Sequence, residues 1–247
     1  MLSILNLLAL ELENMSREGQ KRIVLSGKSV KFLKEMGFPS AADATRDDPL
    51  NPLKSEGCPR GAYPANTVAL PPEGDKAFKY NWLREKVSNC PICQQHVKPG
   101  KKIVFGVGNL DADIFFCGEA PGADEEIVGE PFVGRAGQLL TKMIAAMGLS
   151  RADVYIGNIM NWRPEMASSS GNRPPTGEEI QFCLPYLVAQ IEIIRPKAIV
   201  ALGATAANGL LGHDASRLMK DIRGKWFEFH GAPLMVTFHP SYLLRNG

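Results

Sequence analysis

Two short segments that lie far apart in the sequence combine residue types suited to chemistry on a small polar ligand. The first, residues 118–126, holds two glycines and four carboxylates. The second, residues 239–245, opens with a histidine directly before a proline. Glycines let backbone N–H groups approach a ligand closely, and carboxylates or histidine move protons and oppose developing charge. This is the composition of an active site, and the residues concerned are Gly118, Glu119, Ala120, Gly122, Glu125 and His239.

The spacing of the glycine loop, residues 118–126, argues against a phosphate ligand. Its Gly-x-x-x-Gly pattern differs from the Gly-x-Gly-x-x-Gly fingerprint of dinucleotide-binding folds, and no Gly-Lys-Ser/Thr follows it as in a P-loop. The four acidic side chains would also repel a phosphate or a DNA backbone. One or two of them would suit a cationic transition state. The alternative, an ordinary strand-to-helix turn with solvated acids, stays open on this segment alone.

Asn158 and Phe132 are further candidates for ligand contact. Asn158 lies in an apolar run, and a buried side-chain amide must satisfy both its donor and its acceptor or use them on a ligand. Phe132 follows the glycine loop closely. Taken alone, each residue also fits a structural role in the core.

The segments that surround these residues alternate between strand and helix patterns. Unbroken apolar runs are typical of parallel strands covered on both faces, and we expect strands at 102–107, 114–117, 154–159, 198–202, 225–230 and 234–238. Helical spacing of apolar residues predicts helices at 136–147, 176–194 and 204–211. The alternation predicts a three-layer α/β/α sandwich with a central, mostly parallel sheet. Ligands bind beyond the carboxyl ends of such strands, so the two segments should meet at one edge.

The predicted helix 176–194 carries two local signals. Thr176 and Glu179 have the spacing of a capping box at its start. Pro185 lies inside it and predicts a kink or a late start, because proline lacks the N–H that a helix interior needs.

Composition and length bound the class of protein. The chain has 247 residues and a formal net charge of +2, which does not indicate a strongly basic nucleic-acid-binding protein. We expect a helical and irregular extension over residues 1–80, with helices at 2–15 and 30–36 and a proline-rich tether, and a catalytic-type domain over residues 81–247. No apolar run reaches the length of a membrane span, and no signal peptide pattern begins the chain. We therefore expect no membrane association and a cytoplasmic location.

The cysteines favour a metal or redox role over structural disulfides. The chain has five, and Cys90 and Cys93 stand as a Cys-x-x-Cys pair. In a chain without a secretion signal this spacing is typical of a metal or redox site.

Seven segments in order resemble the family-4 uracil-DNA glycosylases, the iron–sulfur branch of that superfamily. The resemblance covers about residues 89–246 and includes Gly118-Glu119-Ala120-Pro121-Gly122 with Glu125, Pro131-Phe132-Val133-Gly134, Asn158, Asn172-Arg173-Pro174-Pro175, Leu202-Gly203-Ala204, Arg223-Gly224-Lys225-Trp226 and His239-Pro240-Ser241-Tyr242-Leu243-Leu244-Arg245. It implies that the chain flips uracil out of DNA and hydrolyses its N-glycosidic bond, and that it works as a monomer on uracil-containing DNA.

The resemblance also implies a role for each candidate residue. Phe132 would stack on the flipped base, and Asn158 would pair with its O4 and N3–H edge. His239 would stabilise the uracil anion with nearby backbone N–H groups, while Glu119 and Glu125 would position water and oppose the oxocarbenium charge, with their division of labour open. Gly118, Ala120 and Gly122 would shape the base pocket. Contacts to DNA would come from Asn172, Arg173, Ser241, Tyr242, Leu243, Leu244 and Arg245, the last five as a loop in which Leu243 or Leu244 acts as the wedge.

The chain departs from this family at the cluster. The family holds a [4Fe-4S] cluster with four cysteines; Cys90, Cys93 and Cys183 match three, and Trp162 stands in the place of the other. We predict no intact cluster, and no cofactor requirement for the chemistry. A substitute ligand, Cys58 or His96, and a zinc site built from the three cysteines with His96 remain alternatives.

Two other functions compete. A relative that traps its product covalently would need a histidine in the insertion 165–171, and there is none. A DNA-binding protein with this fold but little or no turnover is favoured by Trp162 and the long extension, and opposed by the retained Asn158, His239 and glutamates.

Overall fold

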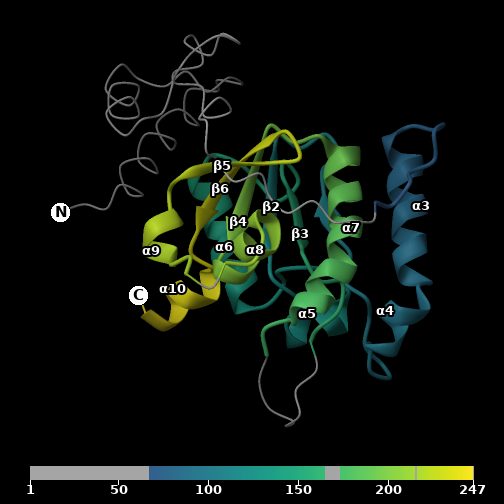
Figure 1. Ribbon diagram of the computed structural model, residues 1–247, viewed down its shortest axis with the longest axis horizontal. Helices are drawn as coiled ribbons and strands as arrows, with labels where there is room; N and C mark the ends of the chain where they lie inside the picture. The colour runs from purple at the N-terminus through teal and green to yellow at the C-terminus, as the bar shows by residue number, and fades with distance from the viewer. Residues whose placement is uncertain (1–66, 165–172, 215, 247) are drawn as a thin grey trace.

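The computed structural model describes residues 67–164, 173–214 and 216–246. Within them, six strands form one sheet in the order β1-β3-β2-β4-β6-β5 (Figure 1). The predicted helices at 2–15 and 30–36 and the proline-rich tether up to residue 66 lie outside the described residues. The strands are β1 (Val107–Gly108), β2 (Ile114–Gly118), β3 (Tyr155–Asn158), β4 (Ala198–Leu202), β5 (Trp226–Phe229) and β6 (Ala232–Thr237).

The centre of the sheet is parallel and its edges are antiparallel. β3, β2, β4 and β6 pair in parallel, while β1 and β5 add antiparallel partners at the two sides. The expected mostly parallel sheet is therefore confirmed, as is the hairpin of β5 and β6. The expected strand at 102–107 is wrong except at its end, because Lys102 and Val104 donate their backbone N–H groups to the carbonyls of Glu126, in a helix, and Asn161, in the loop after β3.

Helices cover both faces of the sheet. Phe115 and Cys117 of β2 lie in a cluster with side chains of α7 and α8, whereas Phe116 points the other way and packs with Leu140 and Ile144 of α6. This alternation produces the three layers that were predicted. The helices are α3 (Lys76–Ser88), α4 (Pro91–Gln95), α5 (Ala123–Val128), α6 (Arg135–Ala146), α7 (Gly177–Ile194), α8 (Ala204–Leu211), α9 (Met219–Ile222) and α10 (Pro240–Asn246).

α7 confirms one local prediction and corrects another. Thr176 accepts the backbone N–H of Glu179 at 3.2 Å, and Glu179 accepts that of Thr176 at 2.7 Å, so the capping box is formed. The helix begins at Gly177 and runs past Pro185, so the late start is wrong. α3 lies beside α7 (Figure 1) and runs across the predicted boundary at residue 80.

The last described segment also differs from expectation. Residues 241–245 were expected to form a loop, but Pro240–Asn246 is the helix α10. Proline favours the first turn of a helix because its fixed φ suits that position, and the carbonyl of His239 accepts the backbone N–H of Tyr242 at 2.9 Å. Among the described helices none is long and apolar enough to cross a membrane.

Candidate active site

The predicted site residues meet at the carboxyl edge of the parallel strands. Gly118 ends β2 and is paired in register with Asn158, which ends β3. β6 ends at Thr237, and His239 follows two residues later. Neighbouring parallel strands bring their carboxyl ends to one edge, which is why segments far apart in sequence share this site.

Gly118 lies at the centre of the group. A Cβ atom placed on it would collide with the Oδ1 atom of Asn158 and come within 2.7 Å of the Phe132 ring. Asn158 is 7% exposed, and its Oδ1 atom is buried with no hydrogen-bond partner. Buried acceptors are normally satisfied, so this oxygen is ready for a donor from a ligand.

Phe132 and His239 face one another beside Gly118. Their ring centroids are 5.6 Å apart with an interplanar angle of 32°. Phe132 is buried and its φ of 56° lies in the left-handed region, which is uncommon for a bulky residue and marks a constrained backbone. Gly203 has φ 94° and its missing side chain lets His239 approach, since a Cβ there would lie 2.9 Å from that of His239.

The hydrogen bonds of His239 identify its tautomer. The backbone N–H of Ser241 lies 3.1 Å from Nδ1 and can only donate, so Nδ1 accepts. The Oγ atom of Ser241 is 2.8 Å from the same nitrogen. Burial, together with the positive charge of Arg245, lowers the pKa of His239 to about 4. At neutral pH the ring is therefore uncharged and carries its proton on Nε2, where it can donate to a ligand.

The carboxylates of the glycine loop divide into different environments. Burial raises the pKa of Glu119, although a hydrogen bond with the Thr205 side chain opposes the shift. Glu125 accepts the backbone N–H of Gly134 at 3.5 Å. Glu126 instead forms ion pairs with Arg163 at 3.0 Å and Lys101 at 3.5 Å, and therefore serves the loop's structure.

Backbone contacts hold the glycine loop against β3. The carbonyls of Gly118 and Glu119 accept the backbone N–H groups of Ile159 and Met160 at 3.0 and 3.1 Å. Gly122 leaves room for Glu125, whose Oε2 atom would collide with a Cβ at that position. Ala120 is partly buried and packs against the cluster that contains Trp162.

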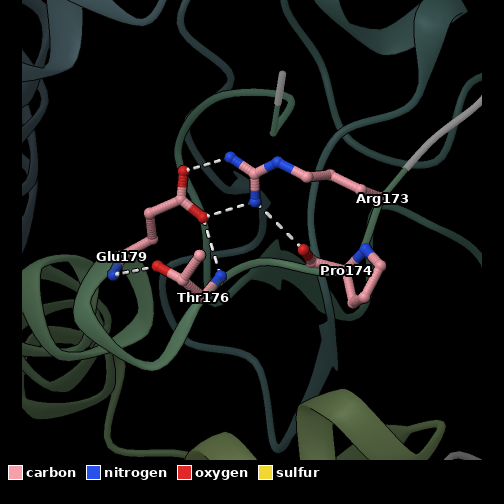
Figure 2. A network of polar contacts seen from close by, with 4 residues as sticks. All are labelled: Arg173, Pro174, Thr176 and Glu179. Carbon is pink, nitrogen blue, oxygen red and sulfur yellow. Dashed lines mark hydrogen bonds and ion pairs between the residues drawn. The ribbon is translucent and has the colours of Figure 1, made fainter. Parts of the chain in front are cut away.

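The predicted DNA contacts occupy two different places. Arg173 binds both carboxylate oxygens of Glu179 at 2.7 Å and the Pro174 carbonyl at 3.0 Å, which ties it to the start of α7 (Figure 2). Asn172 lies outside the described residues. α10 carries the others: Ser241 contacts His239, Leu243 is half-buried, and Tyr242, Leu244 and Arg245 are exposed.

Cys90, Cys93 and Cys183, called the cysteine corner here, lie where α3, α4 and α7 pack together. Cys93, Cys183 and Trp162 are fully buried in one cluster, with Cys90 packed against it. The Tyr186 hydroxyl lies 3.9 Å from the Cys90 sulfur. The rings of His96 and Trp162 stack with centroids 4.6 Å apart and an interplanar angle of 5°.

These residues do not fit a four-iron cluster. Such a cluster needs four thiolates, whereas this corner offers three thiols and the indole N–H of Trp162, which can only donate. Over the residues that the structure describes, no three His, Cys, Asp or Glu side chains are grouped to hold a metal ion. The alternative ligand His96 stacks on Trp162, and Cys58 lies outside the described residues.

Comparison with known proteins agrees with this geometry. Residues 105–247 match the sequence model of the uracil DNA glycosylase superfamily. The chain is 46% identical over 165 residues to the type-4 uracil-DNA glycosylase of Thermotoga maritima, which covers 66% of this chain and 82% of that protein. The chain belongs to the uracil DNA glycosylase superfamily.

Two further members of the superfamily show the same relationship. The type-4 uracil-DNA glycosylase of Pyrobaculum aerophilum is 41% identical over 171 residues, or 66% of this chain and 84% of that protein. The type-4 uracil-DNA glycosylase of Archaeoglobus fulgidus is 42% identical over 166 residues, or 64% of this chain and 80% of that protein. The described sheet and its helices are consistent with this superfamily's fold.

Sequence reasoning gave no site role to three residues that shape the predicted site, although Gly203 stood in one of the matching segments. Thr205 contacts Glu119, Gly203 admits His239, and Arg151 donates to the carbonyl of Phe132 at 3.2 Å. Gly203 stands directly after a predicted strand, which is a recognisable signal. Thr205 and Arg151 have no such signal, because their contacts depend on how separate elements pack.

Proposed function

We propose that this chain removes uracil from DNA by hydrolysing the N-glycosidic bond, and leaves an abasic site. The observation that carries the proposal is the Oδ1 atom of Asn158, which is buried without a partner beside Phe132. The relatives named as type-4 uracil-DNA glycosylases support the same function.

Asn158 is suited to select uracil over cytosine. Uracil offers an N3–H donor and an O4 acceptor side by side, and the amide of Asn158 can accept from the first and donate to the second. Cytosine presents the inverted pattern at these positions, so Oδ1 of Asn158 would face an acceptor. Phe132 would stack on the flipped base, since an aromatic ring is a common platform for extruded bases.

His239 would act on the charge that develops in the transition state. As the C1′–N1 bond breaks, its electron pair moves to uracil and places negative charge on O2, while the sugar becomes an oxocarbenium ion. The Nε2–H group of neutral His239 would donate to O2. Such donors are effective when they are oriented in advance, and the bonds from Ser241 to Nδ1 provide that orientation.

Two carboxylates would complete the hydrolysis. A water molecule adds to C1′ and must lose a proton. Burial raises the pKa of Glu119, which makes its carboxylate a better base than an ordinary glutamate, and it would accept that proton. Glu125, which lies in the same loop, would oppose the positive charge on the sugar. The chemistry proposed here requires no metal or other cofactor.

The face that carries α10 would engage the DNA. Flipping a base costs a few kcal/mol of stacking, which an apolar wedge can offset. Leu244 is 43% exposed on α10 and Leu243 is half-buried, so Leu244 is the better wedge. Tyr242, Ser241 and Arg245 would contact the DNA backbone beside it, and Arg173 with Asn172 would contact DNA from the loop before α7.

We further propose that the protein acts as a monomer in the cytoplasm.

A gel assay tests the function directly. The protein is incubated with an oligonucleotide that contains one uracil, and alkali then cleaves any abasic site. We expect cleavage at uracil and none in the matched cytosine oligonucleotide. Binding to the uracil oligonucleotide without cleavage would support the alternative, a DNA-binding protein with this fold and no turnover.

A further inference from the structure

The backbone of Phe132, in the loop between α5 and α6, has an uncommon conformation that needs contacts from other segments to hold it. Phe132 has φ 56°, which residues with a Cβ atom adopt rarely. The loop stands between α5 and α6 and has no place in the sheet. A conformation of this kind persists when surrounding contacts determine it.

Arg151 supplies such contacts from another part of the chain. Its Nη2 atom donates to the Pro131 carbonyl at 3.0 Å, and its Nη1 atom donates to the Phe132 carbonyl at 3.2 Å. One planar guanidinium thus holds two consecutive carbonyls. Nη1 also lies 3.4 Å from the Oγ1 atom of Thr141 on α6, which donates to the Gly137 carbonyl at 3.0 Å.

Arg151 is itself held in a closed turn directly before β3. The carboxylate of Asp153 accepts the backbone N–H of Ser150 at 2.8 Å and its hydroxyl at 2.6 Å. The Ser150 carbonyl accepts the backbone N–H of Asp153 at 3.1 Å. β3 begins soon after and ends at Asn158, so the clamp connects Phe132 to the strand that presents the amide.

Gly137 makes the clamped geometry possible. A Cβ atom there would collide with the carbonyl group of Phe132. The absent side chain lets the loop lie close against α6 with its carbonyls directed at Arg151. Burial lowers the pKa of Arg151 and the nearby charge of Glu130 opposes this, but an arginine side chain stays protonated in proteins and keeps its donors.

We propose that Arg151 is a positioning residue that fixes the Phe132 ring at the base pocket through the two loop carbonyls. The inference rests on the proposed function, in which Phe132 stacks on the flipped base. Lysine cannot replace arginine here, because its ammonium group is a point charge without the planar fork that bridges two acceptors.

A double-mutant cycle tests whether Arg151 acts through Phe132. We expect Arg151→Lys and Arg151→Met each to lower kcat/KM for uracil excision about 10- to 100-fold, as misplaced pocket groups do. In a Phe132→Leu background the same changes should lower it less than about two-fold further, because coupled residues are not additive. Lys142→Met, an exposed cation on α6, is the matched control and should leave kcat/KM unchanged.

Hydrogen exchange tests the clamp without reference to catalysis. In Arg151→Lys, the amides of residues 132–137 should exchange about ten-fold faster or more, while urea unfolding changes little. Wild-type kcat/KM in Arg151→Lys, equal losses in both backgrounds, or unchanged exchange would overturn the inference. A wild-type protein that releases no uracil would instead overturn the proposed function, and the exchange experiment would still decide on the clamp.

Discussion

Asn158 and Trp162 lie close together in sequence, and each is buried with a side-chain polar atom that has no partner. Their surroundings differ. Oδ1 of Asn158 lies over Gly118, on the same side as the Phe132 ring. The indole of Trp162 lies among apolar side chains and is covered by the stacked ring of His96. The unpaired atom of Asn158 therefore indicates a ligand site, because the neighbouring groups would complement a ligand. The unpaired atom of Trp162 indicates a structural role, because other side chains pack closely around the indole.

The largest expected effect concerns the packing side of this comparison. Trp162→Ala should lower the free energy of unfolding by about 3–5 kcal/mol, because it leaves a large cavity. Trp162→Phe keeps a ring against His96 and should lose less. Urea unfolding measures both, and single-turnover excision by Trp162→Phe should stay near the wild-type rate. If Trp162→Phe lowered the single-turnover rate strongly while its free energy of unfolding stayed near the wild-type value, Trp162 would have a role in the pocket.

His239→Ala tests the chemical side. We expect the single-turnover rate to fall about 100-fold or more, since the Nε2–H group acts on charge present in the transition state. Affinity for abasic DNA should be nearly unchanged. The control is His213→Ala, which removes an exposed histidine after α8. If affinity fell as far as the rate, His239 would be a structural residue.

Asn158→Asp should have a smaller effect than His239→Ala, and it should change the selectivity between uracil and cytosine. A good base-edge contact is worth about 1–3 kcal/mol of discrimination, so excision of uracil should weaken by that amount and some cytosine should be accepted. Two oligonucleotides that differ only in uracil or cytosine at one position measure the ratio of the two excision rates. Asn109→Asp, an exposed position whose side-chain oxygen can still accept from the Asp111 backbone, is the control. Unchanged uracil kinetics in Asn158→Asp would remove this residue from the pocket.

The pH profile should separate Glu119 from His239. If ionised Glu119 accepts the proton of water, activity falls as pH drops through the pKa of Glu119, which burial places above the ordinary 4.5. His239 gains its proton only near pH 4, so it is already neutral in that range and does not set this limb. Glu119→Gln should remove the limb from log kcat/KM along with most of the activity. A limb unchanged in Glu119→Gln would show that Glu119 is not the base.

Metal removal should have the smallest effect of all. We expect purified protein without broad absorbance near 400 nm and with full activity after chelator treatment, because the cysteine corner does not fit a four-thiolate cluster. Metal analysis must accompany the spectrum, since zinc is colourless. Brown protein with about four irons per chain would contradict the prediction and point to Cys58, His96 or an external group as the fourth ligand.

The sequence by itself determined the sheet and the edge at which the site lies. Apolar runs located the strands that end at Gly118 and Asn158 and the strand before His239, and parallel pairing then placed these residues together. The capping box of Thr176 and Glu179 could also be predicted. Apolar runs and capping-box spacing both depend on residues that are close together in the sequence. Pro240 also signalled a helix locally, yet its segment was expected to be a loop.

Tertiary structure decided what depends on packing between distant segments. The clamp of Arg151 on the Phe132 loop joins segments from opposite ends of α6. The neutral state of His239 follows from its burial. Residue type and spacing state which groups are present, but burial and hydrogen-bond partners determine their charge and orientation. Those properties arise when the elements pack.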